Sequence, residues 1–253
     1  MRIISWDDLA AGDCFKNELC AVTAGVFDGV HRGHKELIKR ITAYQVGGCP
    51  PRFKPAKDGV FSATPQAGGG LFHKTGVPPA HGLEGVLKAS LRPPATPPLV
   101  PHKSSAMGLA RLTPVIVTFR ENPRRLLFPN KATLDIISLD EKCALFERAG
   151  IAACILIDFT PDFAQQSGEA FIRGLLTNTN MRYMAIGADF RCGRNGSFSA
   201  PAIKTLVEGD DRPAVCEIVP PVMDDGQPVS SSRIRAALAA GNMSLAARLL
   251  GER

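Results

Sequence analysis

Two histidines three residues apart, His31 and His34, lie at the expected start of a helix, after a turn that holds Gly25, Gly29 and Gly33. The backbone N–H groups and the helix dipole at such a start attract anions. Glycines permit positive φ angles and carry no Cβ that would keep a phosphate away from the main chain. Imidazole groups placed there can donate hydrogen bonds to a phosphoryl group as charge develops on it. This stretch therefore predicts a site for the phosphates of a nucleotide.

A second group of polar residues lies near the C-terminal end of the sequence, where Ser230, Ser231 and Ser232 precede a predicted helix and Arg233 and Arg235 follow them. Arginine matches the geometry of a phosphate with two parallel hydrogen bonds. Serine is also a common helix cap, so this group taken alone is equally consistent with an ordinary helix start. Beside the histidine motif, it predicts the second half of a phosphate site.

A third group, Asp189 and Phe190, follows a predicted strand within Gly187–Arg194. An acid and an aromatic ring suit a flat heterocycle, one by hydrogen bonding and the other by stacking, although an ordinary loop with an Asx turn is the alternative. The sequence has no Gly-x-x-x-x-Gly-Lys-Ser/Thr loop, which argues against a P-loop kinase. No third metal ligand lies close to the two histidines, which argues against a metal site.

The elements that must position these residues can be predicted from apolar periodicity. Short apolar runs predict strands, and amphipathic segments between them predict helices, one of which begins with a capping box at Ser138 and Glu141. The strands are expected at 19–24, 114–119, 151–157, 181–186 and 214–219, and the helices at 33–44, 139–150, 169–176, 200–207, 231–240 and 243–250.

Strands without polar alternation that alternate with helices predict an α/β fold, a Rossmann-like parallel sheet with helices on both faces. Ligands of such sheets bind at the carboxyl ends of the strands. We therefore expect Gly25–His34, Phe119–Pro123 and Gly187–Arg191 to lie along a single edge of the sheet.

The 253 residues predict a single domain, 1–253, interrupted by a Pro/Gly-rich insert at 46–113. This insert contains eleven of the twenty prolines and ten glycines, and we expect it to be disordered because it cannot bury enough apolar surface. Its eight Lys and Arg against two acids account for the whole net charge of +6. The basic character therefore belongs to the insert, and we expect no nucleic-acid partner.

No segment approaches the roughly 18 apolar residues that a membrane-spanning helix needs. The first residues include Asp7 and Asp8 where a signal peptide would be apolar. The seven cysteines are odd in number and scattered, without the paired spacing of a zinc site. These features predict a cytoplasmic protein, which we expect to be a monomer without a membrane partner.

The stretch Gly-Val-Phe-Asp-Gly-Val-His-Arg-Gly-His at 25–34 resembles the signature of the nucleotidyltransferases that share a His-x-Gly-His motif. More narrowly, the chain resembles the adenylyltransferase module of the bacterial riboflavin kinase/FAD synthetase family over about residues 19–45 and 114–251. Five further stretches agree in order: Thr118–Pro123, Phe171–Leu176, Gly187–Gly193, Ser230–Arg235 and Gly241–Gly251.

The resemblance implies transfer of AMP from ATP to the phosphate of FMN, which gives FAD and pyrophosphate in the presence of Mg²⁺. By motif position it implies three sets of residues and no metal ligand from the protein. The catalytic set is His31, His34, Ser231 and Arg235; the ATP-binding set is Gly25, Phe27, Asp28, Gly33, Ser230, Ser232 and Arg233; the FMN-binding set is Phe119, Glu121, Asn122, Asp189 and Phe190.

Three features depart from the family pattern. Family members commonly have Phe-Asp/Glu-Pro-x-Pro after the second strand, whereas this chain has Phe119-Arg120-Glu121-Asn122-Pro123. The long insert replaces a short connection, and the chain ends at Arg253 where the bifunctional proteins continue into a riboflavin kinase barrel, so we expect no kinase activity. Two alternatives stay open: the same chemistry on another phosphorylated acceptor, and a flavin- or nucleotide-binding protein without turnover.

Overall fold

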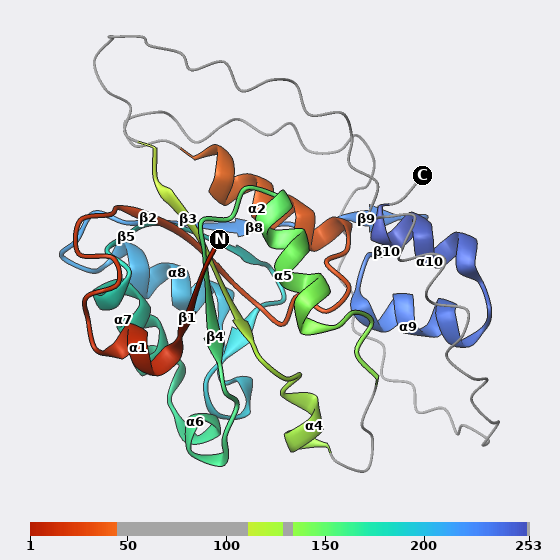
Figure 1. The fold of residues 1–253 in the computed structure, drawn as a ribbon, viewed down its shortest axis with the longest axis horizontal. Helices are drawn as coiled ribbons and strands as arrows, with labels where there is room; N and C mark the ends of the chain where they lie inside the picture. The colour runs from red at the N-terminus through yellow and green to blue at the C-terminus, as the bar shows by residue number, and fades with distance from the viewer. Residues whose placement is uncertain (45–110, 129–133, 252–253) are drawn as a thin grey trace, which may run out of the picture.

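The structure, a computed structural model, describes residues 1–44, 111–128 and 134–251. Its centre is a six-stranded parallel sheet in the order β1-β4-β3-β2-β5-β8 (Figure 1). The strands are β1 (Arg2–Ser5), β2 (Cys20–Ala24), β3 (Thr113–Phe119), β4 (Ala153–Ile157), β5 (Met181–Gly187) and β8 (Val215–Val219). From β2 the chain proceeds through β3 and β4 toward one edge and then through β5 and β8 toward the other, so the strand order reverses beside β2. The predicted α/β fold with a Rossmann-like parallel sheet is confirmed.

Helices cover both faces of this sheet, as predicted. One face packs against α2 (Arg32–Ala43), α5 (Leu139–Arg148), α9 (Ser231–Ala239) and α10 (Met243–Leu250). The other packs against α1 (Trp6–Ala10), α7 (Gly168–Asn178) and α8 (Ala200–Glu208). Because successive strand residues point to opposite faces, Val22 of β2 belongs to one core and its neighbour Ala21 to the other. Both faces are therefore apolar, which is why these strands show no alternation in the sequence.

The predicted helix starts are confirmed where a side chain caps them. Ser138 Oγ accepts a hydrogen bond from Glu141 N at 3.2 Å, and Glu141 Oε2 accepts one from Ser138 N at 2.8 Å, which completes the capping box. Ser167 Oγ caps α7 by accepting from Ala170 N at 3.1 Å. These caps use only neighbouring residues, so the sequence is sufficient to predict them.

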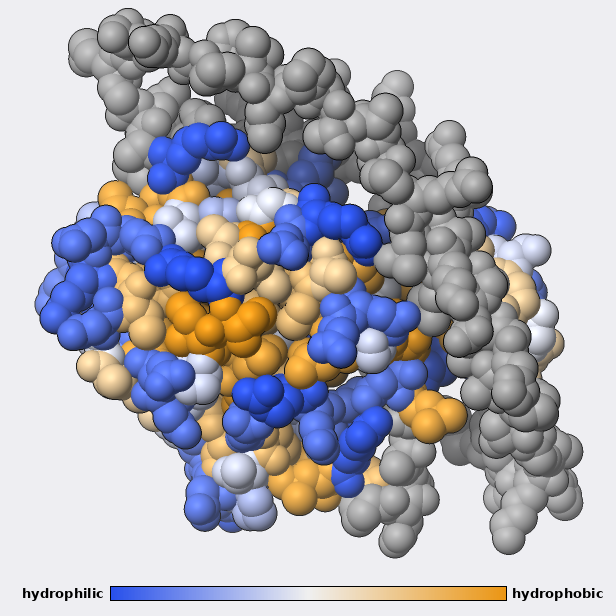
Figure 2. Space-filling model, viewed as in Figure 1, coloured by the Kyte–Doolittle hydropathy of each residue, from blue (hydrophilic) through white to orange (hydrophobic). Residues whose placement is uncertain are grey.

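Several short elements were not predicted. β1 extends the sheet by pairing with β4, and α1 follows it directly. β1 is an edge strand of the sheet, and its residue Ile3 is exposed. Figure 2 shows a hydrophobic area over β1. The other unpredicted elements are α4 (Arg124–Leu127), α6 (Pro161–Gln165), the 3-10 turn η3 (Arg194–Gly196), and two small hairpins: β6 (Arg191–Cys192) with β7 (Phe198–Ser199), and β9 (Met223–Asp224) with β10 (Gln227–Pro228).

The described part of the chain resumes a few residues before the predicted C-terminal end of the insert at Thr113. Thr113 is the first residue of β3 and pairs with Cys20, and Leu112 is buried. The prediction that the insert is disordered falls on residues 46–110, which lie outside the described residues. Within the part of the chain that is described, no helix is long and apolar enough to cross a membrane.

Candidate functional site

A cavity of about 1130 Å³ lies at the carboxyl ends of the strands. Its walls come from the segments after β2, β3, β4, β5 and β8 and from the start of α9. The prediction that Gly25–His34, Phe119–Pro123 and Gly187–Arg191 share one edge is confirmed, because residues of all three line this cavity. Ligand pockets commonly measure about 300–1,000 Å³, so this cavity lies just above the large end of that range.

His31 and His34 form a stacked pair at the start of α2. His31 is the N-cap residue, and its Nδ1 accepts a hydrogen bond from His34 N at 3.4 Å. The two rings stack with centroids 3.6 Å apart and an angle of 16° between their planes. An Nδ1 that accepts leaves the proton of a neutral imidazole on Nε2, which can then donate to a ligand. Both side chains line the cavity.

The glycines around the pair act mainly through close packing. Of Gly25, Gly29 and Gly33, only Gly29 uses the positive φ that glycine permits (+82°). A Cβ at Gly33 would lie 3.2 Å from His31 Cε1, and one at Gly25 would lie 3.1 Å from a ring carbon of Phe27. The missing side chains therefore make room for the rings that line the site.

Burial keeps both histidines neutral in the absence of a ligand. Burial lowers the pKa of His31 from 6.5 to about 4. Burial, and then the neighbouring His31 and Lys142, hold the pKa of His34 well below its usual value. His34 Nδ1 is buried and has no hydrogen-bond partner among the described residues. A bound anion would favour the protonated form of either ring, so the pair can respond to a phosphate by taking up charge.

A measurable pH dependence of stability follows from His31. Between pH 6.5 and about 4 the unfolded chain binds a proton that the buried ring does not, so the free energy of unfolding falls as the pH falls. From pH 7.5 to 5.0 we expect His31 to account for about 2 kcal/mol of this loss. Urea unfolding of the wild type and of His31→Asn at both pH values measures it, and the variant should lose correspondingly less. The same loss in both proteins would contradict a buried neutral His31.

The loop before the histidines is strained and held from two sides. Phe27 and Val30 have φ angles of 53° and 40°, which are unusual for side chains with a Cβ. The carbonyl oxygen of Val26 accepts hydrogen bonds from Thr118 Oγ1 and from the buried Lys142 Nζ, both at 3.1 Å. These bonds fix the loop to β3 and α5, and so fix where α2 begins.

Asp28 joins the histidine loop to the serine–arginine motif. Its carboxylate is buried, accepts a hydrogen bond from Ile136 N at 2.8 Å, and forms an ion pair with Arg235. Its backbone oxygen accepts from Ser231 Oγ at 2.8 Å. The structure therefore brings the two predicted halves of the phosphate site together, and the Asp28 carboxylate is engaged by protein groups at both oxygens.

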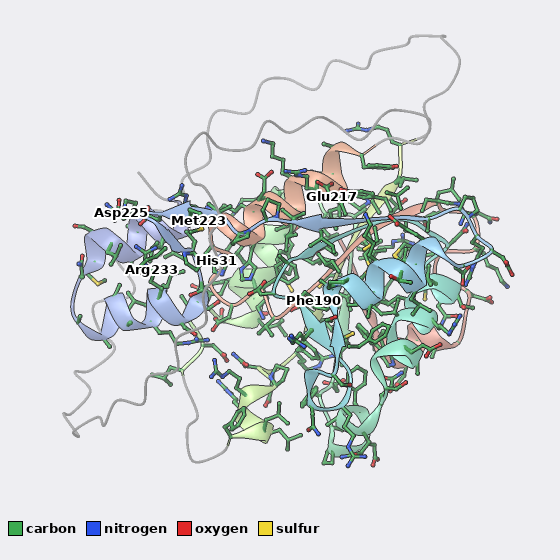
Figure 3. All side chains as sticks on the ribbon, turned by 180° about the vertical axis from the view of Figure 1, so that it is seen from behind. His31, Phe190, Glu217, Met223, Asp225 and Arg233 are labelled. Carbon is green, nitrogen blue, oxygen red and sulfur yellow. The ribbon has the colours of Figure 1, made fainter. Side chains whose placement is uncertain are left out.

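The other residues of the serine–arginine motif divide between the cavity and the protein interior. Ser230 caps α9 by accepting from Arg233 N at 3.3 Å, and Ser230, Ser231 and Ser232 all line the cavity. Arg233 does not line it: its guanidinium binds the Asp224 carboxylate at 3.0 Å and the Asp224 backbone oxygen at 2.9 Å. Figure 3 shows Arg233 and Phe190 on opposite sides of His31.

The predicted flavin-facing residues lie across the cavity from α9, with one exception. Phe119, Asn122, Asp189 and Phe190 line the cavity, whereas Glu121 is exposed and does not. The Asn122 amide is engaged within the protein, because its Nδ2 donates to Asp135 Oδ1 at 3.2 Å and its Oδ1 accepts from Arg124 N at 3.2 Å.

Several residues of this wall were not predicted. Phe159 and Phe163 extend the aromatic surface, with ring centroids 5.6 and 6.4 Å from that of Phe119. The wall also includes Leu127, Phe128, Arg124, Arg191 and Arg194. Arg191 and Arg194 belong to the Gly187–Arg194 stretch, so the sequence was sufficient to predict that they lie near Asp189. The aromatic residues come from separate segments that only the fold brings together.

Comparisons with known proteins agree with this geometry. The FAD synthetase family profile matches residues 15–47 and 102–233, which is more than half of the chain. A protein of Bacillus subtilis (strain 168) named bifunctional riboflavin kinase/FMN adenylyltransferase is 31% identical over 142 residues, which are 56% of this chain and 44% of that protein. The protein of the same name from Escherichia coli (strain K12) is 31% identical over 151 residues, 57% of this chain and 46% of that protein.

The chain therefore spans a little under half the length of these curated relatives. Among solved structures, one titled macrolide-efflux protein from Streptococcus pneumoniae has a TM-score of 0.62 and 22% sequence identity, covering 100% of this chain and 62% of that chain. That likeness shows the fold alone. Because the family profile matches more than half of the chain, the chain belongs to the FAD synthetase family.

Proposed function

We propose that this protein is an FMN adenylyltransferase, which transfers AMP from ATP to the phosphate of FMN and releases pyrophosphate. The observation that carries the proposal is one cavity that joins an anion site, made by His31, His34 and the start of α9, to an aromatic wall with an acid, Asp189. Family membership and the names of the two relatives support the same reaction.

The proposed reaction needs positioning and charge stabilisation more than acid–base chemistry. An oxygen of the FMN phosphate attacks the α-phosphorus of ATP, the bond from that phosphorus to the bridging oxygen of the β-phosphate breaks, and pyrophosphate leaves with the bond electrons. The nucleophile is already an anion, so no proton has to be removed from it. Aligning the two phosphates and stabilising the charge on the transferred group are then the main tasks of the protein.

The proposed roles on the nucleotide side follow from the positions of the donors. The N–H groups at the start of α2, the Nε2 proton of His31 and the ring of His34 stabilise the triphosphate and the charge that develops on the α-phosphate oxygens. The hydroxyl of Ser232 adds a donor at the start of α9, whereas the Ser231 hydroxyl already donates to the backbone oxygen of Asp28 and ties α9 to the histidine loop. Arg235 lines the cavity with its Nε on Leu134 O and one Nη on Asp28, so its other Nη is the group that we assign to a phosphate.

On the acceptor side, the aromatic wall is proposed to hold the flavin ring system. Phe119 and Phe190 offer faces or edges for the planar rings, and Asp189 offers an acceptor for the ring N–H of the flavin. We do not assign Arg233 or Glu121 a substrate contact, because neither lines the cavity.

Magnesium is proposed to arrive with ATP. Mg²⁺ binds oxygen ligands and is commonly held by substrate phosphates and water with one or two carboxylates. Within the described ranges, no group of three or more His, Cys, Asp or Glu side chains is placed to hold a metal ion. The ion would supply charge neutralisation on the phosphates.

The proposal also includes action as a monomer, in the cytoplasm, on small molecules alone.

An acceptor comparison tests this proposal. Purified protein is mixed with ATP and Mg²⁺ and with FMN, riboflavin or nicotinamide mononucleotide, and the dinucleotide product and pyrophosphate are measured by chromatography. We expect FAD and pyrophosphate in equal amounts from FMN, and no product from riboflavin, which has no phosphate. Product from nicotinamide mononucleotide but not from FMN would support transfer to another phosphorylated acceptor. No product from any acceptor would contradict the proposed enzyme.

A further inference from the structure

A short segment, Leu134–Ile136, lies between the two halves of the cavity and contacts both. The nucleotide half is the Gly25–His34 loop with the start of α9, and the acceptor half is Phe119–Phe128 with α4. Asp135 itself does not line the cavity, so any effect that it has on a substrate must pass through the residues that it holds.

The segment binds the nucleotide half through its main chain. Ile136 N donates to Asp28 Oδ1 at 2.8 Å, and Leu134 O accepts from Arg235 Nε at 3.3 Å. Asp28 and Arg235 are also paired with each other and lie in the cavity wall. Backbone groups on both sides of Asp135 are therefore fixed to the site that is proposed to hold the triphosphate.

The segment binds the acceptor half through the Asp135 side chain. Asp135 Oδ1 accepts from Asn122 Nδ2 at 3.2 Å, and Oδ2 pairs with Arg125 Nη2 at 2.8 Å. Asn122 accepts from Arg124 N at the first residue of α4. The next turn of the chain carries Leu127 and Phe128, which line the cavity although about half of each is exposed. Asp135 therefore contacts both Asn122, just before α4, and Arg125 within it.

We propose that Asp135 is a positioning residue that couples the two substrate sites, because its carboxylate holds the acceptor wall while its backbone neighbours hold Asp28 and Arg235. A substrate that binds one side restrains the three-residue segment further, so the second substrate meets a wall whose remaining motion is already reduced. The inference rests on the proposed function, since it takes ATP and FMN as the two ligands. It predicts that each substrate raises the affinity for the other by the same factor.

Calorimetric titration tests the coupling in the absence of turnover. FMN is titrated into the full chain with and without saturating Mg²⁺ and α,β-methylene ATP, which cannot be cleaved at the reacting bond. We expect the wild type to bind FMN about 5- to 150-fold more tightly with the analogue present, the usual range of coupling between two sites. In Asp135→Asn the ratio of FMN affinities with and without the analogue should fall below about three. The affinity of this variant for the analogue alone should differ from that of the wild type by less than about threefold.

Two further variants keep the result interpretable. Asp158→Asn makes the same chemical change in an exposed ion pair with Arg120, 2.8 Å, and should keep the wild-type coupling. Arg125→Met removes only the acceptor-side ion pair from a half-exposed residue, so it should fold and should lower the coupling even if Asp135→Asn does not fold. FMN binding without coupling in the wild type, or unchanged coupling in both test variants, would overturn the proposal. Failure of the wild type to bind FMN under either condition would instead contradict the proposed function.

Discussion

Replacing His31 by alanine is expected to lower kcat by about 10²- to 10³-fold, the usual cost of losing one preorganised donor to a developing negative charge. The ring lies at the start of α2, its Nδ1 is occupied by His34 N, and its Nε2 is the nitrogen left to donate. Because this donor is assigned to an oxygen of the α-phosphate of ATP rather than to the flavin, the dissociation constant of FMN should change by less than about threefold.

Steady-state kinetics with FMN and ATP, combined with equilibrium binding of FMN, measure the two effects separately. His31→Asn keeps an N–H donor near the start of α2, and we expect it to recover part of the lost turnover. Equal losses of kcat and of FMN affinity in His31→Ala would argue against a transition-state role. Wild-type turnover in the alanine variant would remove His31 from the catalytic set.

Replacing Arg235 by methionine is expected to lower the free energy of unfolding by about 3–5 kcal/mol, because the buried Asp28 carboxylate would lose its charged partner. The side chains of the pair are 18% and 4% exposed, so water screens the interaction little. Asp28 also keeps the histidine loop in place through Ile136 N, so the cost is larger than that of a surface ion pair.

Urea unfolding at pH 7.5 measures this change. A second substitution distinguishes the loss of the ion pair from the loss of packing by the Arg235 side chain. Arg235→Met combined with Asp28→Asn should be more stable than Arg235→Met alone, since the residue that lost its arginine partner is then no longer a buried carboxylate. Arg120→Met is the matched control, because its pair with Asp158 is exposed and should contribute less than about 1 kcal/mol. An Arg235→Met protein as stable as the wild type would show that the pair does not hold the loop.

The features that sequence could predict are those with local causes. Apolar runs without alternation predicted five strands of the parallel sheet, and Ser138 with Glu141 predicted a helix start that the structure confirms. Gly25–His34 predicted an anion site, because its glycines, its histidines and the expected helix start are contiguous in the sequence. β1 was missed because it has only four residues and is stabilised by pairing with β4, which is more than 140 positions away in the chain.

The residues whose geometry differs from expectation are those whose polar partners belong to no recognisable motif. Arg233 follows three serines, as a phosphate ligand would, yet it turns to Asp224 in the β9–β10 hairpin. Asn122 lines the cavity as expected, but its amide is already engaged by Asp135 and by Arg124 N of α4. Asp135 had no motif of its own. Spacing shows which residues are near in the chain, and it does not show which distant partner will satisfy a buried polar group.

The fate of labelled ATP tests the central claim most directly. Protein, Mg²⁺ and FMN are incubated with ATP carrying radioactive phosphorus at the α-position and, in a parallel reaction, at the γ-position, and the products are separated. The account predicts the α-label in FAD and the γ-label in pyrophosphate, with one pyrophosphate formed for each FAD. An unlabelled flavin in the α-labelled reaction, or γ-label released as inorganic phosphate with no FAD formed, would contradict AMP transfer in this cavity.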